Sequence, residues 1–277
     1  MDYTLRPRSL GTLLDNTFDI YRRNFLLFVG ISAIPSGILL LLKLAWMGLV
    51  VAAKDTTIIH ASPWVEVSVV LAAVGGWFAT LFVSSIVTAA TTLGVSDVYL
   101  DRPTSIQACF SRIADKAFRV VYVSFVVGLI VGFGTLLCII PGIYWLGKYG
   151  VAIPAVVLED ITGRQALDRS SHLTHDAIGR VIVVALLTSI ITIAMALLLD
   201  AGVSGLTVVF HQARILTGAA AQEITSTIIE ILFGPISAIA LTLVYYDQRV
   251  RKEAFDIEHM MTLMGVPKDL PSGAPAS

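Results

Sequence analysis

The stretch LVYYDQRVRKEAFD, residues 243–256, marks a change in the character of the chain. Upstream of it lies about one helix length of apolar residues, and downstream the chain becomes charged. Tyr245 and Tyr246 stand at the change, and aromatic residues of this kind gather where a helix meets the membrane–water interface. Acids and bases then follow four residues apart, as in Asp247 and Arg251, a spacing that supports an exposed helix. The stretch therefore predicts a helix that leaves a bilayer.

The composition of the whole chain also indicates a membrane protein. Of its 277 residues, 56% are hydrophobic and 14% are charged, whereas about 25% of the residues of soluble domains are charged. A soluble fold of this length needs more polar surface than this chain supplies. The net charge is −1, so no overall field predicts a nucleic-acid partner. The partner that the composition does predict is the lipid bilayer.

Six apolar runs are long enough to cross the hydrocarbon core of a bilayer, which is ~30 Å thick and needs about 20 helical residues. Backbone polar groups in lipid must be satisfied within their own segment, so each run is expected to be a helix. The expected spans are residues 25–51, 65–93, 120–140, 143–158, 181–199 and 224–246. The predicted fold class is all-α and polytopic, with six transmembrane helices.

The expected domain organisation follows from these spans. A six-helix membrane domain covers residues 25–257, after an amphipathic N-terminal segment at residues 1–24 and before a flexible tail at residues 258–277. Residues 203–216 are only partly apolar and contain His211. We interpret them as an interfacial helix in an outer loop, with a further membrane span as the alternative.

The basic residues predict the orientation of the chain. Fifteen of the nineteen lie on one side of the expected membrane domain: Arg6, Arg8, Arg22, Arg23, Arg102, Arg112, Lys116, Arg119, Arg164, Arg169, Arg180, Arg249, Arg251, Lys252 and Lys268. Cytoplasmic loops carry such an excess of Lys and Arg. We therefore expect a multi-pass protein of the cell membrane with both termini in the cytoplasm.

A short amphipathic segment precedes each pair of spans, at residues 9–23, 104–119 and 162–180. Apolar residues recur in each at intervals of three and four, which predicts three helices lying in the headgroup layer. Thr104 is the expected N-cap of the second. A weak threefold repeat of interfacial helix and two spans is one interpretation, and chance periodicity is the other.

The exits of the second, fourth and sixth spans share a further pattern. Each has an acid followed four or five residues later by an arginine, in the pairs Asp97 with Arg102, Glu159 with Arg164, and Asp247 with Arg251. Together with Arg169 and Arg249, the residues of the last two exits form a candidate rim that binds a lipid phosphate or a partner. The alternative is that the charges form a helical ion-pair ladder that needs no ligand.

Two charged residues are expected to lie deepest in the membrane, Lys148 in the fourth span and Glu230 in the sixth. Ionisable residues inside a membrane are costly, so each is a candidate functional residue. They are expected either to pair with one another or to line a polar cavity. Other charges, such as Lys43 and Glu223, lie nearer the expected ends of spans.

The sequence predicts no catalytic set, metal site or cofactor. Ser171 and His172 are adjacent, so a helix would separate their side chains by about 100°. His172 and His175 stand three residues apart without an evident third ligand. The two cysteines, Cys109 and Cys138, are interpreted as small apolar residues. The chain also lacks the phosphate-loop, dinucleotide-binding and HExxH motifs.

Four motifs together resemble one known family. They are LGTLLDNTFDIYRRNF (10–25), PGIYWLGKYGVAIPAVVLE (141–159), GRQALDRSSHLT (163–174) and YYDQRVRKEAFD (245–256). The chain resembles, over about residues 9–257, the membrane domain named after bacterial glycerophosphoryl diester phosphodiesterases. In some members this six-span domain precedes a soluble phosphodiesterase barrel. We expect no such barrel after the sixth span of this chain, so the hydrolytic activity of the family is not carried over and the resemblance implies only a membrane protein.

Two positions depart from the pattern of that family, which affects local packing more than the expected fold. His172 stands where the family usually has tryptophan, and Ala254 stands where it usually has glycine.

Three functions are weighed from the sequence. The first is a non-enzymatic membrane protein that binds, transports or organises lipids or phosphate-bearing amphiphiles. The second is a scaffold or accessory subunit for a cytoplasmic or membrane partner, and the third, an intramembrane hydrolase, lacks a catalytic set. The first predicts a cavity that opens near Glu159, Arg249 and Arg251 and is lined by Lys148 or Glu230.

Overall fold

The computed structural model describes residues 9–54, 63–209 and 215–253, and these residues contain helices and no strand. The helices are α1 (Leu10–Arg23), α2 (Phe25–Lys54), α3 (Pro63–Tyr99), α4 (Ile106–Ala114), α5 (Ala117–Leu137), α6 (Ile139–Tyr149), α7 (Ala152–Leu158), α8 (Gly163–Thr174), α9 (Ile178–Val209) and α10 (Ile215–Glu253). Six stretches among them are long and apolar enough to cross a membrane. The predicted all-α polytopic fold is thereby confirmed.

The six membrane-crossing stretches overlap the six apolar runs of the sequence. They are Phe25–Val50, Val70–Tyr99, Ala117–Leu137, Ile139–Leu158, Ile178–Val203 and Gly218–Glu253. The fourth is not one helix, because α6 and α7 are separated at Gly150 and Val151. The last continues seven residues beyond the expected end at Tyr246, because the ion-pair ladder extends α10.

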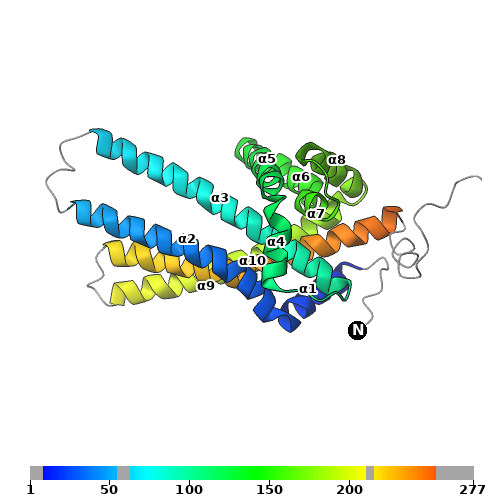
Figure 1. The fold of residues 1–277 in the computed structure, drawn as a ribbon, viewed down its shortest axis with the longest axis horizontal. Coiled ribbons are helices and arrows are strands. Elements are labelled where there is room, and N and C mark those ends of the chain that lie inside the picture. The colour runs from blue at the N-terminus through cyan, green and yellow to red at the C-terminus, as the bar shows by residue number, and fades with distance from the viewer. Residues whose placement is uncertain (1–8, 55–62, 210–214, 254–277) are drawn as a thin grey trace, which may run out of the picture.

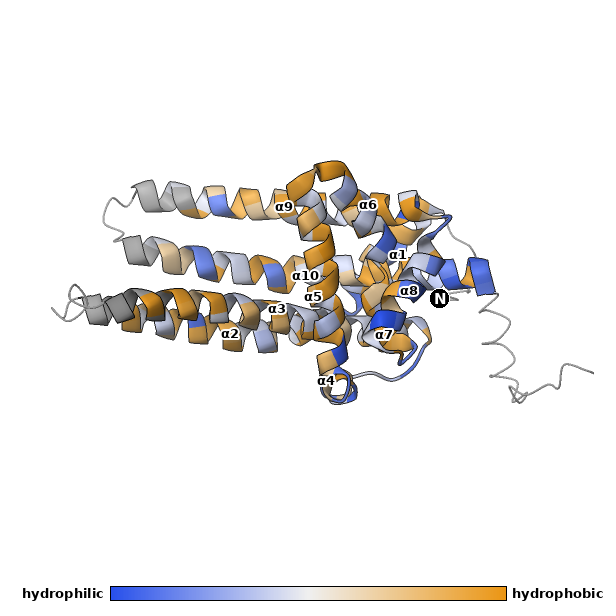
Figure 2. Ribbon diagram, turned by 90° about the horizontal axis from the view of Figure 1, so that it is seen from above, coloured by the Kyte–Doolittle hydropathy of each residue, from blue (hydrophilic) through white to orange (hydrophobic). Residues whose placement is uncertain are grey.

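Four long helices, α2, α3, α9 and α10, run along the length of the molecule (Figure 1). In the view turned by 90°, α5 runs across the direction of these helices (Figure 2). The α5–α6 hairpin reaches from α3, which α5 contacts, to α9, which α6 contacts. The short helices α1, α7 and α8 gather toward the end at which α10 finishes. We call this end of the molecule, which carries Arg169, Arg180, Arg249 and Arg251, the basic end.

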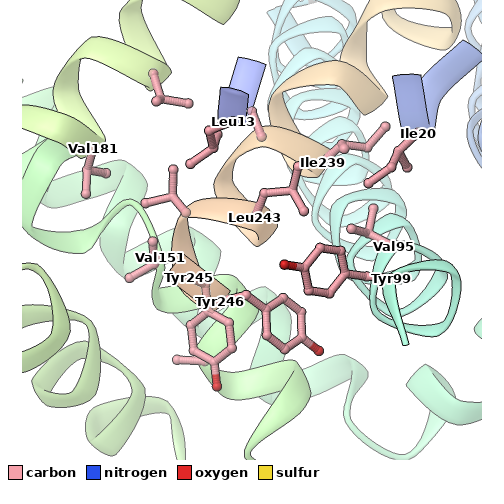
Figure 3. Close-up of a cluster of buried hydrophobic side chains, with 14 of the residues drawn as sticks. Leu13, Ile20, Val95, Tyr99, Val151, Val181, Ile239, Leu243, Tyr245 and Tyr246 are labelled. Carbon is pink, nitrogen blue, oxygen red and sulfur yellow. The ribbon is translucent and has the colours of Figure 1, made fainter. Parts of the chain in front are cut away.

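The best-packed core lies at the basic end, around α10. There Leu13 and Ile20 of α1 and Val95 of α3 surround Leu243 and Tyr245 of α10, all of them buried (Figure 3). In α10, 56% of the most apolar stretch is buried, against 11% in α3. The helix that carries the exit stretch is therefore the central element of the fold.

Away from that core, the long helices expose large apolar side chains. Leu42 of α2, Leu71 and Trp77 of α3, and Leu197 and Leu198 of α9 are all exposed. In water such a surface drives aggregation, but against lipid tails it is the ordinary outer face of a membrane helix. The exposure agrees with a chain that crosses a bilayer.

The α5–α6 hairpin corrects the expected boundary between the third and fourth spans. The sequence predicts that Pro141 follows the end of a helix, whereas α5 ends at Leu137 and Pro141 lies in the first turn of α6. A proline fits there because the first N–H groups of a helix have no partner within it. The extended residue Cys138 makes the turn.

The short helices form where amphipathic segments were predicted, with corrected boundaries. Ser105 caps α4 by accepting a hydrogen bond from the Ala108 N–H at 3.2 Å, so the predicted cap Thr104 is wrong. The hydroxyl of Thr104 instead lies 3.4 Å from the sulfur of Cys109. The third segment ends earlier than expected, because α8 stops at Thr174 and Arg180 belongs to α9.

The predicted interfacial helix at residues 203–216 is wrong for the part of it that the structure describes. Helix α9 continues without interruption to Val209, and α10 has begun at Ile215. A helix already formed is extended more easily than a new one is nucleated. Residues 210–214 and the predicted tail at 258–277 lie outside the described residues.

Candidate functional site

The carboxylate of Glu159 is the centre of a charged network at the basic end. Glu159 follows α7, and both of its oxygens accept hydrogen bonds from Arg169 Nε of α8, at 2.9 and 2.8 Å. The hydroxyl of Tyr245 in α10 donates a third, at 2.7 Å. Arg249 Nε lies 3.8 Å away. One acid thus connects α7 and the following helix α8 to α10, whose Tyr245 is 86 residues further along the chain.

A second acid, Glu253, closes this network. Its carboxylate accepts hydrogen bonds from Arg169 at 2.7 Å and from Arg249 at 3.2 Å. The hydrogen bond to Glu253 raises the pKa of Arg169, so this guanidinium stays charged between its two acids. We call the residues Glu159, Arg169, Tyr245, Arg249 and Glu253 the α7–α8–α10 clasp.

A second ionic cluster centres on Asp247, whose side chain is only 2% exposed. Arg180 of α9 donates to it at 2.6 Å, and Arg251 donates at 2.9 Å from one turn further along α10. The neighbouring side chain of Gln248 donates as well, at 3.3 Å. This cluster fastens α9 to α10, and a buried carboxylate is stable there because it is compensated by charge.

Further ion pairs join the remaining elements at this end. Asp97 of α3 binds Arg112 of α4 at 2.8 Å. Asp176 binds Lys252 at 2.9 Å and is also hydrogen-bonded to His175. The hydrogen bond with His175 contributes most to lowering the pKa of Asp176, to about 2. Ion pairs at this end therefore involve α3, α4, α8, α9 and α10.

Five of the six candidate rim residues fall in these two clusters. The predicted pairs of Asp247 with Arg251 and Arg249 with Glu253 both form. Arg164 does not join them: it is exposed in the first turn of α8 and has no ion pair within the described residues.

At the other two exits, the acid binds a different arginine from the one that follows it in the exit pattern. Glu159 binds Arg169 instead of Arg164, and Asp97 binds Arg112 instead of Arg102. In both places the chain leaves the helix through a residue with a positive φ, Asp160 at 53° and Asp101 at 54°. A left-handed residue ends the helical spacing, so the next arginine no longer follows the acid on one helix face.

Lys148 and Glu230, which the sequence predicts either to pair or to line a polar cavity, form no ion pair with one another within the described residues. The carbonyl of Lys148 accepts hydrogen bonds from the hydroxyls of Ser170 and Thr174, at 2.9 and 3.0 Å, which tie α6 to α8. The cross-helix pair at membrane depth is instead Lys43 of α2 with Glu223 of α10, at 3.1 Å. Lys43 stands in an otherwise apolar run, whereas Glu223 directly precedes the sixth expected span and has polar neighbours.

Two hollows stand out among the described residues, and neither is the cavity expected from the sequence. An apolar groove of about 480 Å³ lies between α3 and α5, lined by Phe78, Ala79, Leu81, Phe82, Phe118, Val121, Tyr122 and Phe125. A polar hollow of about 370 Å³ lies on α8 and α10, lined by Asp168, Ser171, His172, His175, Asp176 and Lys252. Neither is lined by Glu159, Arg249, Arg251, Lys148 or Glu230.

Basic residues border one end of the apolar groove. Phe118, which is 84% exposed, is followed directly by Arg119. Arg119 and Lys116 both bind the carboxylate of Asp160, at 2.9 and 3.2 Å. The hydrogen bond from Lys116 contributes most to lowering the pKa of Asp160. These pairs place an ionic rim beside an aromatic groove.

The first turn of α8 lies against the same end of the groove. A Cβ atom on Gly163 would come within 2.4 Å of the ring of Tyr122, so α8 approaches α5 as closely as a glycine allows. The exposed Arg164 is the next residue. We define the candidate rim as Lys116, Arg119, Asp160 and Arg164, three basic groups and one acid, and include Arg164 because it follows Gly163 in the chain.

The polar hollow contains serine, histidine and aspartate without a formed nucleophile. His175 and Asp176 are hydrogen-bonded at 2.9 Å, but their side chains are 80% and 72% exposed. No hydrogen bond joins Ser171 to either histidine in the part of the chain that the structure describes. Over the same residues, no three His, Cys, Asp or Glu side chains gather as a metal-binding group.

Comparison with known proteins adds no further assignment. No protein-family model, curated protein or solved structure matches the chain.

Removing the Tyr245 hydroxyl tests whether the α7–α8–α10 clasp is structural. We expect Tyr245→Phe to destabilise the protein by about 1.5–3 kcal/mol, the usual contribution of a hydrogen bond to a charged group. Thermal unfolding in detergent, followed by size-exclusion chromatography, measures the change. Tyr144→Phe is the matched control, because Tyr144 is half exposed on α6. Equal melting of both variants would contradict the role of this hydrogen bond.

Proposed function

We propose that this chain is a non-enzymatic membrane protein that binds an anionic phospholipid at its basic end. An acyl chain occupies the groove between α3 and α5, and the phosphate contacts the ionic rim of Lys116, Arg119 and Arg164. The observation that carries the proposal is the aromatic groove ending at a rim with three basic groups and one acid.

The rim, more than the groove, would make the site selective. An acyl chain in the groove leaves a lipid environment for another apolar one, so its transfer contributes little free energy. Arginine and lysine at the headgroup level instead contribute about 1 kcal/mol each toward an anionic lipid. Asp160 compensates one of the three basic groups, which leaves a net charge that attracts a phosphate.

The arginines of the clasp are a poorer phosphate site than those of the rim. Arg169 and Arg249 are largely buried and are already held by Glu159 and Glu253. A phosphate that displaced one of these acids would leave a carboxylate without compensation, which is strongly destabilising. Arg164 is exposed and offers its guanidinium without that cost.

Orientation and family remain parts of the proposal. The excess of Lys and Arg at the basic end favours a cytoplasmic location for it, in the cell membrane. The resemblance to the membrane domain of glycerophosphoryl diester phosphodiesterases is compatible with a phosphate-bearing amphiphile as ligand.

Native mass spectrometry with added phosphatidylglycerol or phosphatidylcholine tests the proposal. Wild-type protein should retain phosphatidylglycerol preferentially, and Arg119→Ala/Arg164→Ala should reduce that preference about tenfold, because two cationic contacts are lost. Ala79→Trp, which fills the groove, should lower the retention of both lipids. The two kinds of variant thus distinguish the contribution of the lipid headgroup from that of the acyl chain.

Arg22→Ala/Arg102→Ala is the matched control for this experiment. It removes two arginines from α1 and from the connection after α3, and neither residue lines the groove. An equal loss of phosphatidylglycerol in this control would mean a non-specific charge effect. Unchanged lipid retention in both groove and rim variants would contradict the lipid site.

A scaffold is the second candidate function, favoured by the polar hollow on α8 and α10. Its exposed mixture of acid, histidine and lysine side chains suits a protein partner better than a lipid tail. If the rim and groove variants leave lipid retention unchanged, this hollow becomes the better candidate site.

A further inference from the structure

We infer that Glu230 is a proton-binding site within the membrane, at the interface of α2 and α10. The inference is independent of the lipid site, which lies between α3 and α5. It rests on the register of two packed helices, on the absence of a partner for the carboxylate, and on a buried hydroxyl at the same level.

The register of α2 against α10 is set by a single ion pair. The two helices pack against each other and run in opposite directions (Figure 1). The Lys43 ammonium binds the Glu223 carboxylate across their interface at 3.1 Å. Because the helices are antiparallel, positions before Lys43 in α2 lie beside positions after Glu223 in α10.

Ser36 and Glu230 each lie seven residues from this pair, toward the basic end. Seven residues are almost two helical turns and rise about 10 Å, so both return to the interface that Lys43 and Glu223 occupy. The register therefore places Ser36 and Glu230 at one level. Ser36 is 3% exposed, and its hydroxyl has no hydrogen-bond partner within the described residues.

The Glu230 carboxyl group has no hydrogen bond or ion pair to any residue that the structure describes, although it is partly buried. Lys43 is a cation whose charge acts on this carboxyl group, and it is already engaged by Glu223. An isolated carboxylate in hydrocarbon is costly unless it is neutralised. A proton is the simplest neutralising ligand, and the protonated group can donate to an oxygen such as that of Ser36.

The charged and titratable groups around Glu230 are few. They are Lys43 on α2, Glu223 on α10 itself, Asp200 on α9 and Tyr21 on α1, whose hydroxyl donates to the carbonyl of Leu232. Along α3 no charged residue lies between Val70 and Ser96. The site is therefore one acid in a mainly apolar interface, and only Lys43 offers a compensating charge.

The position of Glu230 also connects it to the weakest turn of α10. Gly234 and Pro235 follow one turn later, and the Glu230 side chain lies 3.8 Å from the Cβ position of Gly234. Pro235 lacks the N–H group that would close the helical hydrogen bond across that turn. Gain or loss of the proton would thus act beside a turn that is already free to bend.

Labelling with dicyclohexylcarbodiimide tests the inference, because this apolar reagent adds a protonated carboxyl group across its C=N bond. Wild-type protein in liposomes should acquire one adduct at Glu230, located by peptide mass spectrometry. Above the titration midpoint the labelling should fall about tenfold per pH unit, since only the protonated form reacts. Glu230→Gln should lose the adduct, whereas Glu223→Gln should keep it.

Several outcomes would overturn the proton site. They are the absence of an adduct at Glu230 between pH 5 and pH 9, equal labelling of Glu223, and an adduct that persists in Glu230→Gln. Protection by sodium at constant pH would replace the proton with a sodium ion as ligand. Because the wild-type pH profile needs no variant, misfolding of a substituted protein does not obscure the result.

Discussion

Asp247→Ala should destabilise the protein by about 3–5 kcal/mol, the range found when one partner of a buried ion pair is removed. The side chain of Asp247 is 2% exposed, and it compensates both Arg180 and Arg251. Without it, two guanidinium groups remain beside each other at the α9–α10 interface. Thermal unfolding in detergent, measured by size-exclusion chromatography after heating, should show the apparent melting temperature lowered by roughly 10 °C.

A matched variant distinguishes this effect from ordinary surface electrostatics. Arg23→Ala removes an i,i+4 pair with Asp19, in which the arginine side chain is 47% exposed. Exposed pairs of this kind contribute at most about 1 kcal/mol, so this variant should melt close to wild type. If Asp247→Ala and Arg23→Ala have the same melting temperature, the Asp247 cluster does not stabilise the fold.

Gly142→Ala should also destabilise the protein, because no side chain fits where α6 turns back against α5. A Cβ atom at Gly142 would lie 2.8 Å from the backbone of Thr135 and closer still to its hydroxyl. Backbone atoms cannot move aside as a flexible side chain can, so the hairpin must open, at about 1–3 kcal/mol. The same unfolding assay measures the loss.

The control for this variant changes the same residue type in the neighbouring helix. Gly132 lies in α5, and a Cβ atom there would meet nothing within 4 Å. Alanine is the better helix former by about 1 kcal/mol, so Gly132→Ala should be neutral or slightly stabilising. Opposite signs for the two variants support the close approach of α5 and α6, and equal destabilisation would contradict it.

The exit stretch shows how much of the candidate site is readable from sequence. The pairs of Asp247 with Arg251 and Arg249 with Glu253 are local, since helical spacing alone brings residues four apart together. The partners that bury these charges, Arg180 and Arg169, come from other helices. Sequence spacing contains no information about them, because they depend on which helices pack together.

The predicted contacts that differ from the structure have the same physical reason. The position of each residue along its apolar run suggests that Lys148 could pair with Glu230. Position along a run does not show which side of its helix a residue occupies. In the structure the backbone carbonyl of Lys148 accepts hydrogen bonds from α8, and it is Lys43 that binds Glu223. The residues of the expected rim likewise separate, because acids of the clasp compensate Arg169 and Arg249 whereas Arg164 is exposed.

The sequence by itself determined that this protein is all-α, that it has six stretches able to cross a membrane, and that α10 ends in an ion-pair ladder. Hydropathy and helical periodicity depend on residues that are close in sequence, so both can be determined without knowledge of the fold. The tertiary structure alone decided that Glu159 and Asp247 join separate helices, and that α5 meets α3 in an aromatic groove. Those contacts link residues far apart in sequence, and only packing specifies them.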